Sequence, residues 1–135
     1  MSDTLTWQSG NFMAKPNSNY GFCGLTIPLI EKGIPLGVTA LDLVESADDL
    51  EGVRMLILSY DCMKPKNEQV NNAIAQWVKD GGVLLYVGGH DDFEPIEDEW
   101  WQKEYGMTPL EHLLSELELD ITVGGPAGMS ELEWT

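Results

Sequence analysis

The hydrophobic pattern between residues 54 and 89 changes from strand period to helix period and back. Residues 55–58 and residues 83–87 are unbroken apolar runs of strand length, which predict strands covered on both faces. Between them, apolar residues recur with helical spacing at positions 70, 73, 74, 77 and 78 and predict a helix over residues 68–79. Strand, helix and strand in such a short stretch form a right-handed βαβ unit, so we expect the two strands to lie parallel and adjacent.

Weaker patterns predict further elements on the N-terminal side of this unit. Residues 20–32 favour a helix, although Pro28 falls inside it and is expected to kink or end it. Residues 34–43 favour a strand, and residues 46–50 favour a single helical turn. Residues 1–19 are rich in turn residues and predict an arm in place of a strong first strand.

On the C-terminal side, a long loop precedes a helix and a last strand. Residues 90–106 show no clear period, and a loop of this length in a compact domain is often functional. Thr108 as N-cap, Pro109 in the first turn and Glu111 in a capping box predict that a helix begins here. Residues 119–123 then favour a strand.

These elements together predict one α/β domain. A chain of 135 residues with 43% hydrophobic content is long enough to bury its own core. We expect a three-layer α/β/α arrangement with a mainly parallel sheet of about five strands, in which strands 54–59 and 83–87 are central. The predicted divisions are an N-terminal arm (1–19), the α/β domain (20–123) and a C-terminal tail (124–135).

The chain is strongly acidic, because 23 acidic residues against seven basic ones give a net charge of −16. Such a charge repels polyanions, so we expect neither nucleic acid nor an anionic membrane surface as a partner. Eleven acidic residues lie between Asp91 and Asp120, together with a single basic one, Lys103. No apolar run has the length of a membrane span and no leader pattern opens the sequence, so we expect a cytoplasmic protein.

Three segments of the chain resemble a known family. They read EKGIP at residues 31–35, LEGVRMLILSYD at residues 50–61 and AIAQWVKDGGVLLYVGG at residues 73–89. Together they look like the class I glutamine amidotransferase-like fold, and most like its version in the trimerisation domain of bacterial β-galactosidases and related glycoside hydrolases. The resemblance covers residues 20–123 and implies a flavodoxin-like sheet with helices on both faces.

The same resemblance bears on activity. Catalytic members of that family carry a cysteine on the turn after the strand that matches residues 83–87. In this chain residues 88–91 read Gly-Gly-His-Asp, without a cysteine. We therefore expect a non-catalytic module for assembly or ligand binding, associated with a carbohydrate-active protein. The alternative is a hydrolase or transferase that uses Cys62 or His90 at the carboxyl edge of the sheet.

Candidate ligand-binding residues follow the two strongest strands, because open α/β sheets bind ligands at the carboxyl ends of their strands. Asp61 and Cys62 follow the first strand, and His90 and Asp91 follow the second. Cys62 is either a reactive thiol or a small buried residue that closes the strand.

The long loop adds an aromatic pair, Trp100 and Trp101, to the candidate ligand-binding residues. These tryptophans either stack on a sugar ring or partner, or pack inside the domain and anchor the loop. His112 is expected to be an exposed helix residue that forms no dyad with its neighbour Glu111, since adjacent helix residues point about 100° apart.

A metal site is a further candidate in the same loop. His90, Asp91, Asp92 and Glu94 offer one nitrogen and three carboxylates over five positions. Their spacing matches no regular metal motif, and a hydrated acidic loop is the alternative. No cofactor is expected.

An extensive contact with another chain or domain is also predicted. The first strand is weak, and short apolar segments that contain Trp7 and Trp134 lie near the two ends of the sequence. Unpaired strand edges and apolar patches usually mark interfaces, so we expect a homo-oligomer or a contact with flanking domains of a longer chain. A carbohydrate or another small molecule is the expected ligand class.

Overall fold

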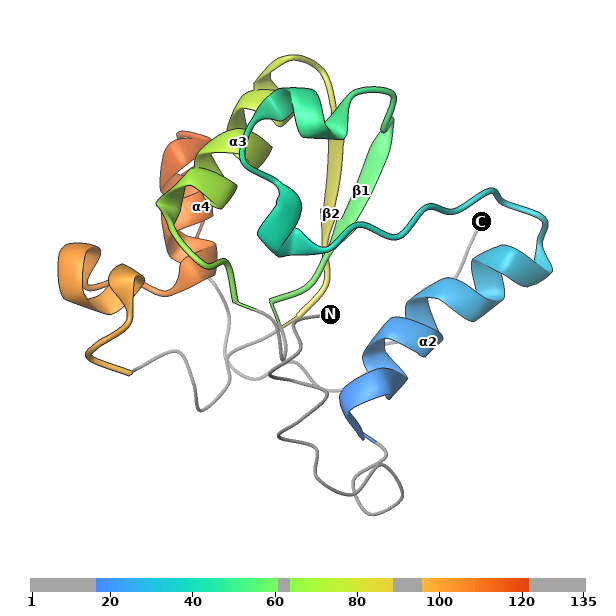
Figure 1. Cartoon of the computed structure of the whole chain (residues 1–135), viewed down its shortest axis with the longest axis horizontal. Coiled ribbons are helices and arrows are strands. Elements are labelled where there is room, and N and C mark those ends of the chain that lie inside the picture. The colour runs from blue at the N-terminus through green and yellow to red at the C-terminus, as the bar shows by residue number, and fades with distance from the viewer. Residues whose placement is uncertain (1–16, 61–63, 89–95, 122–135) are drawn as a thin grey trace.

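The computed structural model describes residues 17–60, 64–88 and 96–121 (Figure 1). For residues 17–23 it describes the backbone alone. The predicted N-terminal arm and C-terminal tail, with Trp7 and Trp134, lie outside the described residues.

The predicted βαβ unit is the centre of the structure. Strand β1 (Met55–Leu58) and strand β2 (Val83–Tyr86) pair in parallel, with Met55 opposite Val83 and Leu58 opposite Tyr86. Helix α3 (Glu68–Lys79) connects them and packs its buried residues against one face of the sheet. The prediction of two adjacent parallel strands joined by a helix is therefore confirmed.

The turn from α3 into β2 depends on two glycines. Gly81 has a φ of +108°, and the amide groups of Gly81 and Gly82 donate to the carbonyls of Val78 and Trp77, at 2.9 and 3.0 Å. This pair of bonds is a Schellman motif, which ends the helix with a left-handed residue. The indole of Trp77 lies over Gly82 so closely that a Cβ there would come within 3.0 Å of the ring.

The two faces of the sheet differ in their cover. Leu58 belongs to the buried core and Leu56, Leu84 and Tyr86 pack against it, together with side chains of α3 and α4 (Pro109–Glu116). Because side chains alternate along a strand, Met55, Ile57, Val83 and Leu85 point to the opposite face. Met55 and Val83 are 56% and 52% exposed there. We call these four side chains the open sheet face.

The prediction of a three-layer, flavodoxin-like fold with a sheet of about five strands is wrong. The described part of the chain contains a sheet of two strands only. The expected strand at 34–43 is an extended segment followed by a 3₁₀ turn, η1 (Leu41–Leu43), and residues 119–121 are not in a strand. Pro35 offers no amide hydrogen to a neighbouring strand, which opposes a central position in a sheet.

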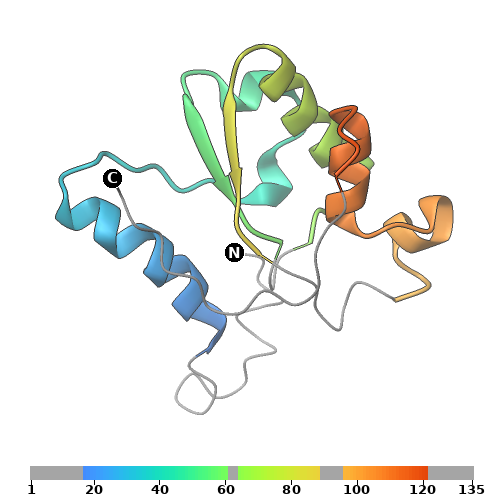
Figure 2. The ribbon, with the colours of Figure 1, turned by 180° about the vertical axis from the view of Figure 1, so that it is seen from behind.

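Helix α2 (Asn17–Glu31) begins before the predicted start and continues through Pro28. A second Schellman motif ends it, since Gly33 has a φ of +73° and Ile34 N donates to Leu29 O at 3.0 Å. In Figures 1 and 2 the sheet lies between α3 and α2, and α2 stands apart at the end of an extended connection.

The C-terminal described elements pack on α3. The capping box predicted for α4 is confirmed: Thr108 Oγ1 accepts from Glu111 N at 3.2 Å, and Thr108 N donates to Glu111 Oε2 at 2.7 Å. A short π-helix, η3 (Trp101–Tyr105), precedes it within the expected loop. The helical turn predicted at residues 46–50 is also confirmed, as η2 (Ala47–Leu50).

Candidate functional site

Most of the predicted site residues lie outside the described residues. These are Asp61, Cys62, His90, Asp91, Asp92 and Glu94. The structure therefore neither brings them together nor separates them, and their proposed roles stay predictions. Of the predicted site residues, Trp100 and Trp101 are described.

A buried polar cluster joins the end of β1 to helices α3 and α4. Tyr60, two residues beyond β1, donates its hydroxyl hydrogen to Asn71 Oδ1 on α3. Asn71 Nδ2 donates to Pro109 O at 2.9 Å and lies 3.1 Å from His112 Nδ1 on α4. Asn71 is completely buried and His112 is 3% exposed. The prediction that His112 is an exposed helix residue is therefore wrong.

The hydrogen-bond directions in this cluster assign the state of His112. Asn71 Oδ1 accepts from Tyr60, so the amide nitrogen of Asn71 faces both Pro109 O and His112 Nδ1. A nitrogen that receives a hydrogen bond carries no proton, so His112 is neutral and holds its hydrogen on Nε2. Protonation at Nδ1 would place two donors against each other.

Aromatic rings enclose the imidazole of His112. The rings of Trp100 and Tyr105 meet it edge to face, with centroids 5.0 and 4.6 Å away. Trp100 Nε1 donates to Pro65 O at 2.9 Å, and the Tyr105 hydroxyl donates to Glu68 Oε2. Trp101 is 2% exposed. Both tryptophans thus pack against the domain in this structure, and their proposed contact with a ligand stays a prediction.

The environment of the cluster shifts three pKa values. Burial lowers the pKa of His112, and the negative charges of Glu116 and Glu68 partly oppose this shift. Burial raises the pKa of Tyr60. The hydrogen bond to Glu68 raises the pKa of Tyr105 to about 12. At neutral pH these three side chains are uncharged, so the cluster acts as a neutral hydrogen-bonded link between α3 and α4.

Sequence patterns missed this cluster because Asn71 and His112 are polar residues next to apolar stripes. Asn71 follows Val70, and His112 precedes Leu113, and both of these apolar neighbours are fully buried. Two helices that pack closely also bury the residues at the borders of their stripes. The available signal was the polar side chain at the border of each stripe, which becomes informative once the two helices are known to pack together.

The described residues hold no other recognisable centre of chemistry. Among them, no group of three His, Cys, Asp or Glu side chains could hold a metal ion. No described helix is long and apolar enough to cross a membrane.

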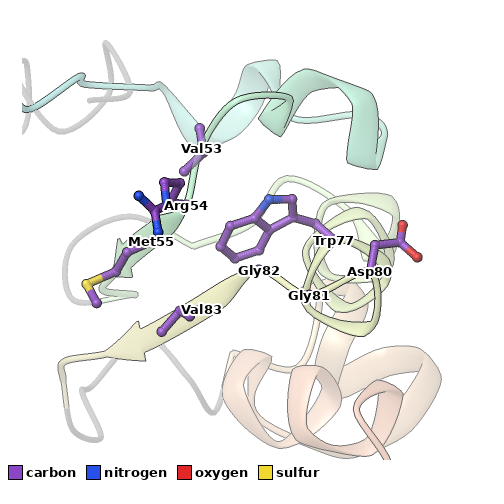
Figure 3. A pocket seen from close by; sticks show the side chains of 8 residues that line it. All are labelled: Val53, Arg54, Met55, Trp77, Asp80, Gly81, Gly82 and Val83. Carbon is purple, nitrogen blue, oxygen red and sulfur yellow. The ribbon is translucent and has the colours of Figure 1, made fainter.

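A surface hollow lies at the amino ends of β1 and β2, beside the open sheet face (Figure 3). Its volume is about 630 Å³. It is lined by Val53, Arg54, Met55, Trp77, Asp80, Gly81, Gly82 and Val83. Figure 3 shows the Trp77 indole reaching over Gly82 toward the start of β1. Because Met55 and Val83 belong to both features, the hollow and the open sheet face form one continuous surface.

Comparison of the chain with protein-family models, with curated proteins and with solved structures finds no match. The resemblance to the glutamine amidotransferase-like family therefore stays a prediction from the three segments quoted above. The candidate function has to be argued from the described geometry.

Proposed function

We propose that this chain is a non-catalytic assembly module whose open sheet face is covered by an apolar surface of a partner. The observation that carries the proposal is the exposure of Met55 and Val83, which stand opposite each other in the parallel pairing and are both more than half exposed. Strands of a parallel sheet are normally buried on both faces.

The hollow beside Trp77 supports this proposal. Ligands of open α/β sheets bind at the carboxyl ends of the strands, whereas the hollow lies at their amino ends. A recess that continues an apolar face suits a protruding side chain of a protein partner. The proposed setting beside a carbohydrate-active protein rests only on the resemblance of the quoted segments.

Two measurements on the purified chain test the proposal together. Sedimentation velocity gives the association state, and the neutral dye Nile red reports accessible apolar surface. A face built for assembly is either covered in an oligomer or accessible to the dye in a monomer. The substitution Val83→Asp should dissociate the oligomer in the first case and weaken dye binding in the second.

Ile96→Asp is the matched control, since Ile96 is also an exposed apolar residue and belongs neither to the open sheet face nor to the lining of the hollow. It should change neither result. A chain that stays monomeric at 15.0 kDa and binds no dye would overturn the proposal. Sedimentation is run at low salt and at about 0.15 M salt, where the screening length is about 8 Å. A chain that is monomeric only at low salt is kept apart by charge repulsion, whereas a chain that is monomeric at both salt concentrations lacks the contact.

A further inference from the structure

A second apolar surface runs along the end of α2 and the segment that follows it. Its large side chains are exposed, with Ile30 at 60% and Val38 at 72%. We call this surface the α2 strip, and it consists of Ile27, Ile30, Ile34, Leu36 and Val38. The side chains at positions 34, 36 and 38 lie in the segment that follows α2, where residues 31–39 are all exposed.

The α2 strip lies in a part of the chain that has no net charge. The four charged residues among the first forty, Asp3, Lys15, Glu31 and Lys32, cancel one another. The whole net charge of −16 therefore lies in residues 41–135. Repulsion between two such acidic copies is weakest where the surface that one presents to the other carries no net charge.

The α2 strip and the open sheet face have complementary properties. One is a helix end with exposed apolar side chains that packs closely on no other described element, and the other is a sheet face that no described helix covers. Glu31 and Lys32 border the strip with opposite charges, and Arg54 and Asp80 line the hollow beside the face with opposite charges, so neither margin carries a net charge that would repel the other. In both views of the ribbon α2 stands off its own sheet (Figure 2).

The connection between the two surfaces allows them to separate. Within the described part of the chain, residues 35–39 form no backbone hydrogen bond. A segment of this length spans up to about 3.3 Å per residue when extended. Such connections permit the exchange of identical elements between copies.

We propose that two copies of the chain form a closed dimer in which the α2 strip of each covers the open sheet face of the other. The proposal rests on the assembly function above and names its partner. Reciprocal exchange makes the same contact twice, which closes the assembly and leaves neither apolar surface open for further addition. The neutral strip adds no negative charge to the surface of the acidic partner.

Mixing two variants tests the exchange. Val83→Asp damages the face and Ile30→Asp damages the strip, so a dimer of either variant alone has both contacts broken. Each should dissociate at least about 100-fold more readily than the wild type, as expected for the loss of central contacts. A mixed dimer keeps one intact contact, between the strip of the Val83→Asp copy and the face of the Ile30→Asp copy. The mixture should therefore contain a species of twice 15.0 kDa that neither variant forms alone at the same concentration.

Other arrangements give different results. If α2 pairs with α2, Val83→Asp stays dimeric on its own because its strip is intact, and this result overturns the exchange. If the wild type is a monomer and Val83→Asp weakens its binding of Nile red, the partner is not a second copy. This result overturns the dimer but not the proposed assembly function. If the wild type is a monomer that binds no dye and Ile30→Asp makes it bind dye, then the α2 strip of each copy covers its own sheet. This result overturns both proposals. Circular dichroism checks that each variant is folded, and Met55→Asp replaces Val83→Asp if the latter is unfolded.

Discussion

The indole of Trp77 lies directly over Gly82 and occupies the space where any other residue would place its Cβ. The contact fixes the end of α3 against the start of β2, and both residues line the hollow beside the open sheet face. The geometry of the proposed assembly surface therefore depends on one glycine and one tryptophan.

Gly82→Ala should destabilise the chain, because the added methyl group overlaps the buried indole and α3 must shift. Overpacking of this kind costs about 1–3 kcal/mol of the free energy of unfolding. Gly37→Ala is the control, since a Cβ there meets nothing within 4 Å and its φ is not positive. Urea unfolding of both variants measures the difference. Equal stabilities would show that Trp77 is not held over Gly82.

Asn71→Ala should cost more than an ordinary helix substitution. It leaves the hydroxyl of Tyr60 and the Nδ1 atom of His112 buried without their partner. Each buried polar group without a hydrogen bond costs about 1–3 kcal/mol. The neighbouring Asn72→Ala, at an exposed position of α3, should cost less than about 1 kcal/mol. Similar losses of stability for the two variants in thermal or urea unfolding would show that the buried network does not stabilise the chain.

Acidification should destabilise the chain through His112. Burial holds the pKa of His112 below the ordinary value of 6.5, so the folded chain binds a proton at this site less readily than the unfolded chain does. The stability contributed by neutral His112 is present above pH 6.5 and is lost as the pH falls through and below that value. The free energy of unfolding of the wild type, minus that of His112→Gln, should therefore decrease between about pH 7.5 and about pH 5.5.

Several charged or titratable groups face His112 and must be held constant in this comparison. They are Glu68 on α3, Glu116 on α4 and Tyr105 on η3. The glutamine variant keeps all three and removes only the titrating ring, so the carboxylates affect both proteins alike. A difference in the free energy of unfolding that does not change with pH would show that His112 is protonated equally in the folded and unfolded chain.

Glu118→Gly should stabilise the chain. Glu118 ends α4 with a φ of +59°, while the equivalent positions of α2 and α3 are Gly33 and Gly81. A left-handed conformation costs a residue with a side chain about 1 kcal/mol. Its ion pair with Lys79, at 3.7 Å between largely exposed side chains, offsets little of this. A rise in the midpoint of thermal unfolding is expected, and Glu116→Gly, inside the helix, should lower it.

The βαβ unit could be predicted because its signals are local. The apolar runs at β1 and β2, the stripe of α3 and the glycines at 81 and 82 each indicate their element without reference to the rest of the chain. The capping box at Thr108 is equally local. The segment at 34–40 has the composition of a strand, but a strand also needs a neighbour, and that requirement is not visible in the segment itself.

The polar cluster around His112 could not be predicted for a related reason. Its members lie just after β1 and on α3, η3 and α4, and the separation of Asn71 and His112 along the chain gives no sign of their contact. The predicted residues Cys62 and His90 lie outside the described residues, so the alternative of a hydrolase or transferase stays an untested prediction.

The rate at which hydrogen peroxide oxidises Met55, followed by mass spectrometry over a range of protein concentrations, tests directly whether a second copy covers the open sheet face. Met107 lies between η3 and α4, is also exposed, and serves as the internal reference. If a second copy covers the open sheet face, the oxidation rate of Met55 relative to Met107 falls as the chain associates, and Val83→Asp or Ile30→Asp restores it. A ratio that stays constant from the dilute to the concentrated chain would show that no second copy covers this face.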